Sequence, residues 1–139
     1  MGVTGRTFAS ALALAAAPLA AEPAAECTDP VTQSAMNICS FEDYRAADAQ
    51  LNAAWKRARD LAKSIDRRSA QAGAAEDRFA RLLDAQRKWL AYRDAHCLAV
   101  VGERTPDSGT IWPLAQNTCM TQLTLARTQL LRQYADQPN

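Results

Sequence analysis

The feature that most constrains the fold is the segment over residues 86–97 (QRKWLAYRDAHC), in which polar and apolar side chains recur at helical spacing. Steps of three and four residues place one mixed set on a single face of an α-helix: Gln86, Trp89 or Leu90, Arg93 and Cys97. A plain core helix would fill such a face with Leu, Ala and Val. The amide and the guanidinium therefore need polar partners from other parts of the chain, because unpaired polar groups are costly to bury.

The first residues of the chain have the features of an export signal. A short stretch with one positive charge, Arg6, precedes the apolar run TFASALALAAA, which is too short to span a bilayer. We predict a signal peptide over residues 1–21, a single domain over residues 22–139 and a periplasmic or secreted location. Glu26 precedes Cys27, where a lipid-attachment signal needs a small residue, so we expect no membrane anchor after cleavage.

The charges of the chain are balanced. It has 16 basic and 15 acidic side chains, and the predicted signal peptide contains one basic residue, Arg6, and no acidic one. The mature chain is therefore neutral. Without a basic excess, neither nucleic acid nor an anionic membrane surface is an expected partner.

Four cysteines remain in the mature chain, and an even number in an exported protein predicts two disulfides. Three pairings are possible. We predict Cys27 with Cys39 and Cys97 with Cys119, because each pair closes a short loop beside an expected helix end. No metal or cofactor is expected, since there is no Cys-x-x-Cys pair and the only histidine, His96, would point away from its neighbour Cys97 on a helix.

Helical patterns account for most of the remaining sequence. Asp29-Pro30 opens a short helix through about Ile38, and Ser40 with Asp43 resembles a capping box that starts a new helix after a kink near Cys39. The three long amphipathic helices are expected from Ser40 to about Ile65, from about Ala74 to Val101 and from about Leu114 to Ala135. No alternating segment rich in Val and Ile competes. The predicted fold is all-α, a disulfide-pinned antiparallel bundle of three main helices plus a short N-terminal helix.

Five polar residues fall within the apolar stripes of the three long helices. They are Asp48 and Asn52 on the first, Gln86 and Arg93 on the second, and Arg127 on the third. Because a lone buried charge costs several kcal/mol, we predict that they form one buried network in which Asp48 accepts from Arg93, Arg127 or both. The alternative is that these groups line a ligand pocket or take part in acid/base chemistry.

The segment over residues 103–113 (ERTPDSGTIWP) reads as a loop, closed at its base by the expected bond between Cys97 and Cys119. Its Trp112 either folds back to cap the open end of the bundle or acts as a binding anchor, since large aromatics on constrained loops lose little entropy on contact. Ser108 and Trp112 are the candidate partner contacts.

No motif for catalysis is present. The sequence lacks a phosphate-binding loop, a dinucleotide fingerprint, a zinc motif and a nucleophile elbow. His96 has no serine or acid at a recognisable motif spacing and reads as a surface or cap residue. We therefore expect a protein that is not an enzyme and that has no catalytic residues.

Four motifs resemble the N-terminal domain of the LprI-type lysozyme inhibitors over roughly residues 27 to 134. They are Met36-Asn37-x-Cys39, Tyr44-x-x-x-Asp48-x-x-Leu51-Asn52, Gln86-x-x-Trp89-Leu90-x-Tyr92-Arg93-Asp94-x-x-Cys97, and Cys119 followed by Thr124-x-x-Arg127-x-x-x-Leu131. The resemblance implies an exported bacterial helical domain with disulfides. The family's namesake is a lipoprotein that inhibits lysozyme, whereas this chain lacks the lipid signal and has no net charge to steer it toward a basic lysozyme.

The resemblance implies an exported binding protein that blocks a glycosidase by surface occlusion, with lysozyme as the candidate partner. From a different class, the alternative is a periplasmic structural or adaptor domain that binds another envelope protein and does not inhibit lysozyme. An enzyme of unknown reaction is the third and weakest reading.

Overall fold

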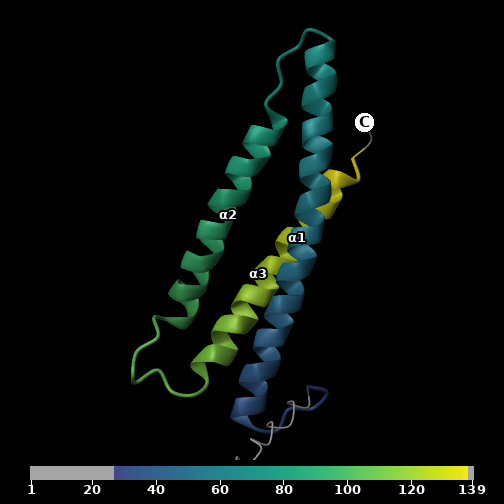
Figure 1. Ribbon diagram of the computed structural model, residues 1–139. Helices are drawn as coiled ribbons and strands as arrows, with labels where there is room; N and C mark the ends of the chain where they lie inside the picture. Colours follow the sequence, from purple (N-terminus) through teal and green to yellow (C-terminus); the bar gives the residue numbers. More distant parts are fainter. Residues whose placement is uncertain (1–26, 138–139) are drawn as a thin grey trace, which may run out of the picture.

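The computed structural model describes residues 27–137, which form three helices and, within that range, no strand (Figure 1). Helix α1 spans Gln33–Gln71, α2 spans Arg78–Val101 and α3 spans Trp112–Ala135. The predicted all-α bundle is confirmed. The predicted signal peptide over residues 1–21 lies outside the described residues. No described helix combines the length and the apolar content needed to cross a bilayer.

Helix α1 begins once, at its Thr32 cap, and continues through the expected kink. The Thr32 hydroxyl accepts from the Ala35 backbone N–H at 3.1 Å. Ser40, which we expected to cap a new helix, instead donates to the Asn37 carbonyl oxygen at 2.9 Å, a bond that a serine inside a helix commonly makes. The predicted break near Cys39 is therefore wrong, and the expected short N-terminal helix forms the first turns of α1.

Helices α1 and α3 pack closely against each other, and α2 lies antiparallel to α1 with fewer contacts to both (Figure 1). The core is built around Leu51, Ala54 and Ala58 of α1 and Leu131 of α3. Most buried residues of α1 are small, which lets the α3 backbone approach. The buried residues of α1 are Cys39, Ser40, Ala47, Leu51, Ala54, Ala58 and Ala62. Larger side chains of α2 and α3, among them Leu82, Trp89 and Tyr134, close the core at its edge.

Both predicted disulfides are present. Cys27 is bonded to Cys39, which ties the segment before α1 to its second turn. Cys97 is bonded to Cys119, which joins the last turns of α2 to the first turns of α3. The α2–α3 loop (residues 102–111) is therefore closed at its base by a covalent bond.

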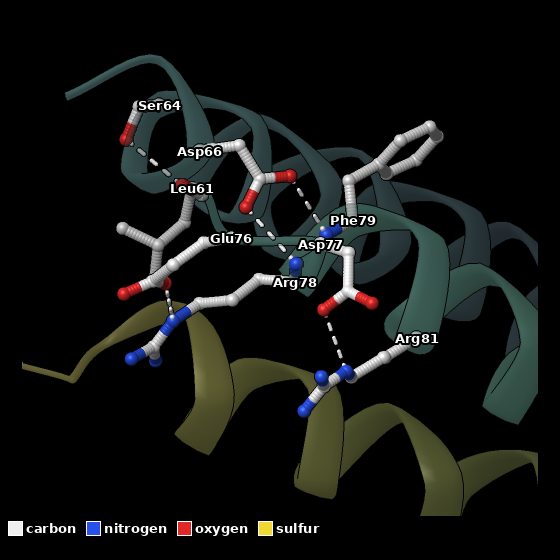
Figure 2. A network of polar contacts seen from close by, with 8 residues as sticks. All are labelled: Leu61, Ser64, Asp66, Glu76, Asp77, Arg78, Phe79 and Arg81. Atoms are coloured by element: carbon white, nitrogen blue, oxygen red, sulfur yellow. Dashed lines mark hydrogen bonds and ion pairs between the residues drawn. The ribbon is translucent and has the colours of Figure 1, made fainter. Parts of the chain in front are cut away.

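At the other end of α2, the cap comes from α1 (Figure 2). The two carboxylate oxygens of Asp66 accept from the backbone N–H groups of Arg78 and Phe79 at 2.9 and 3.0 Å. Asp77, the residue directly before α2, makes no side-chain cap and pairs with Arg81 at 2.6 Å. Helix α2 thus starts at Arg78, after the expected Ala74, because the carboxylate that caps it belongs to another helix.

Candidate functional site

Arg93 lies at the meeting point of the three helices. Its side chain is only 6% exposed, and its guanidinium carbon lies 5.3 Å from the ring centre of Trp89 on α2 and 5.7 Å from that of Tyr44 on α1. Two of its nitrogens bond to the Asp94 carboxylate at 2.9 Å, and a third lies 3.4 Å from the Thr124 hydroxyl of α3. Aromatic faces and one neighbouring carboxylate therefore satisfy this buried cation.

Arg127 of α3 bonds to Gln86 of α2. Its Nε donates to Oε1 of the buried Gln86 at 2.9 Å, and its guanidinium carbon lies 5.9 Å from the Trp89 ring centre. Burial lowers the pKa of Arg127 below its ordinary value, because desolvation disfavours the charged form. Trp89 thus lies near both guanidinium groups, and the contacts join α2 to α3.

The predicted role of Asp48 in this network is wrong. Among the described residues Asp48 forms no ion pair with Arg93 or Arg127; it accepts from Asn52, one turn along the surface of α1, at 3.0 Å. Arg93 uses the adjacent Asp94, and Arg127 uses a neutral amide. The five predicted residues therefore form separate groups, in which Asp48 is half-buried and Asn52 is exposed.

The α2–α3 loop is ordered by its own hydrogen bonds, most of them to Ser108. The Ser108 hydroxyl accepts from the Thr105 N–H at 2.7 Å and donates to the Glu103 carbonyl oxygen at 3.3 Å. The Ser108 N–H donates to the Thr105 carbonyl oxygen at 3.1 Å, which closes a turn around Pro106 and Asp107. Ser108 therefore holds the loop in shape.

Trp112 begins α3 and faces the end of α2. Its indole N–H donates to the carbonyl oxygen of Gly102, the residue that ends α2, at 3.0 Å. The guanidinium carbon of Arg104 lies 5.7 Å from the Trp112 ring centre. The indole is half-buried and bonded to the end of α2, and Trp112 also lines a pocket.

This Trp112 pocket has a volume of about 620 Å³ and is built from both helices and the loop between them. Helix α2 contributes His96, Val100 and Val101. Ser108 and Ile111 line the loop side, while the α3 side includes Trp112, Leu114 and Gln122. Its size is that of ligand sites, and both predicted partner contacts, Ser108 and Trp112, line it.

The Trp112 pocket has an apolar, exposed rim. Val100 is 65% exposed and Ile111 is 60% exposed. None of the residues that line the pocket is acidic. His96 lies at its α2 wall, with Nδ1 3.4 Å from the Tyr92 hydroxyl. The arrangement suits an apolar protein contact with a few hydrogen-bonding groups around it.

The loop was predicted as a contact segment, but His96 and Val100, which form the α2 wall of the pocket, were not. The signal was present, because the bond between Cys97 and Cys119 requires the end of α2 to face the start of α3. Within residues 27–137 no group of three or more metal-ligating side chains occurs. A second pocket, of about 560 Å³, lies at the opposite end and is lined mainly by charged residues of the first turn of α2 and of the connection before it.

Comparison with known proteins identifies the family. Residues 24–131 match the family model described as "Lysozyme inhibitor LprI". An uncharacterized protein of Rhizobium meliloti (strain 1021) is 35% identical over 119 residues, which cover 82% of this chain and 81% of that protein. No solved structure matches the chain. Since the family match covers most of the sequence, including all four cysteines and the α2–α3 loop, the chain belongs to the LprI lysozyme inhibitor family.

Proposed function

We propose that this protein inhibits a lysozyme-type glycosidase by laying the α2–α3 loop and the Trp112 pocket over the enzyme's substrate cleft. Membership of an inhibitor family supports a protein partner of this class. The single observation that carries the choice of surface is the Trp112 pocket, which adjoins a loop closed by the bond between Cys97 and Cys119. A surface occluder needs no catalytic group of its own.

The loop is ordered before it meets a partner. The disulfide at its base, the hydrogen bonds to Ser108 and the indole bond of Trp112 to Gly102 all restrict it. A restricted loop loses little conformational entropy on binding, so more of the contact energy goes into affinity. The exposed side chains of Val100 and Ile111 supply apolar surface, and burying this surface against a partner favours binding.

The proposal includes export to the periplasm or beyond. All four cysteines are paired, and disulfides of this kind persist in oxidising compartments. A lysozyme that attacks the cell wall would be met there.

The test is a turbidity assay of lysozyme acting on cell walls, run with the mature protein and with surface variants. We expect inhibition by the parent protein, and a loss of about tenfold or more in potency for Ile111→Glu and Val100→Glu, since each places a charge in the apolar contact. Leu130→Glu is the matched control, because Leu130 is 56% exposed on α3 and does not line the pocket.

Circular dichroism melting of each variant separates binding from folding. All three substitutions are at exposed positions, so their melting temperatures should stay close to that of the parent. No inhibition by the parent at a large molar excess would refute the proposed function and favour an adaptor that binds another envelope protein. Equal potency of all three variants would refute the assigned surface.

A further inference from the structure

We propose that Arg104 is the specificity residue of this inhibitory surface and that its guanidinium pairs with a catalytic carboxylate of the glycosidase. This inference rests on the proposed function and adds to it a chemical partner for one side chain. Arg104 is exposed in the α2–α3 loop, next to the rim of the Trp112 pocket.

Arg104 is positioned but has no counter-charge. Its guanidinium carbon lies 5.7 Å from the Trp112 ring centre, and the Trp112 indole is in turn bonded to Gly102. Among residues 27–137 no carboxylate lies within ion-pair distance of Arg104, although Glu103 and Asp107 belong to the same loop. The Trp112 ring therefore positions the Arg104 guanidinium, and the hydrogen-bond donors of this guanidinium remain available to solvent or to a partner.

The two arginines that bond within the bundle differ in this respect. Arg93 is buried and bonded to Asp94, and Arg127 is bonded to Gln86. The lining of the Trp112 pocket contains no acidic residue, so a carboxylate that approached the pocket would meet no repelling side chain in its wall. Arg104 is thus the cation that such a carboxylate would reach at the rim.

A glycosidase cleft supplies the complementary group. Glycosidases of the lysozyme kind carry a pair of carboxyl groups flanking the scissile bond. A guanidinium matches a carboxylate by two parallel hydrogen bonds, and its planar group can stay stacked on an indole while doing so. Contact with either carboxylate would both anchor the inhibitor and occupy a group that the enzyme needs.

The experiment measures dissociation constants by calorimetry for two enzymes, a purified c-type lysozyme and the same lysozyme with both of its catalytic carboxyl residues replaced by the corresponding amides. The inhibitor variants are Arg104→Ala, Arg104→Lys and the control Arg87→Ala. Arg87 is an exposed arginine of α2 that does not line the Trp112 pocket. Calorimetry reports binding without needing an active enzyme, so both lysozymes can be compared directly.

We expect Arg104→Ala to weaken binding to the unaltered lysozyme about tenfold or more and to the amide-substituted lysozyme about twofold or less. Arg104→Lys should lie between, because it keeps the charge and loses the paired geometry. Arg87→Ala should bind like the parent.

The failures are distinguishable. If the parent binds but Arg104→Ala binds equally well, or loses the same factor with both enzymes, this inference is overturned and the proposed function stands. If the parent binds neither lysozyme, the proposed function fails and this inference fails with it.

Discussion

Replacing Asp66 by Ala should destabilise the protein, because one carboxylate of α1 caps the start of α2. Asp66 accepts from the first two backbone N–H groups of α2, those of Arg78 and Phe79 (Figure 2). Without the carboxylate, these donors face water or stay unpaired, and the favourable interaction of a negative charge with the helix N-terminus is lost. The substitution also removes a direct link between α1 and α2.

The magnitude follows from the cost of losing a helix cap, which is about 0.5–2 kcal/mol. Asp66 makes two such bonds, and the one to Phe79 is partly buried, so we place the loss in the upper half of that range, about 1–2 kcal/mol. For a domain of this size that corresponds to a fall in melting temperature of roughly 4–8 °C. Asp66→Asn should fall in between, because an amide keeps one acceptor oxygen and no charge.

The assay is urea unfolding followed by circular dichroism, with Asp77→Ala as the matched control. Asp77 directly precedes α2, but its side chain makes no cap hydrogen bond and pairs with the exposed Arg81. Loss of such a surface pair costs about 0.5 kcal/mol or less. If Asp77→Ala destabilises as much as Asp66→Ala, the assignment of the cap to α1 is refuted.

Three further predictions concern the disulfide, the α2–α3 contacts and the indole. Replacing Cys97 and Cys119 together by Ser should cost about 3 kcal/mol of unfolding free energy, from the loop of sequence separation 22 that the bond closes, and an unchanged melting temperature would contradict this. Gln86→Met and Arg127→Met should each lower the free energy of unfolding by about 1–3 kcal/mol. The double variant should lose about 1 kcal/mol less than the sum of the two single losses. If the losses measured by urea unfolding are strictly additive, the bond between Gln86 and Arg127 contributes nothing. Trp112→Phe should lower the unfolding free energy by about 1 kcal/mol through loss of the bond to Gly102, a loss that equal unfolding midpoints would disprove.

The helices were predictable because their apolar spacing is set along the chain, whereas their ends depend on neighbours. Ser40 has the sequence of a cap but bonds back to Asn37 and accepts from Asn117 of α3 at 3.1 Å, so α1 continues. Asp66 lies inside α1 and caps α2. Periodicity identifies neither Asn117 as the partner of Ser40 nor Arg78 as the partner of Asp66. Only the packed bundle brings these residues together.

The pairing of the polar residues was predictable from the sequence only in part. Stripe position placed Gln86 and Arg127 on facing sides, and they are bonded. Asp48 was predicted as the partner of Arg93, but Arg93 bonds to Asp94. Asp94 was not considered because adjacent residues point in different directions on a helix. A long arginine side chain can nevertheless bend back to its neighbour, as its 2.9 Å bonds show. Side-chain reach, which periodicity ignores, decided this case.

The disulfide at the base of the α2–α3 loop fixes the ends of the two helices and leaves the exposed loop residues free to vary. Between Cys97 and Cys119 the chain completes α2, forms the loop over residues 102–111 and begins α3. The disulfide keeps the two helix ends together whatever residues occupy the exposed positions of the loop. Such a frame can present different turns to different enzymes, so members of one lineage could diverge in target while retaining a common architecture.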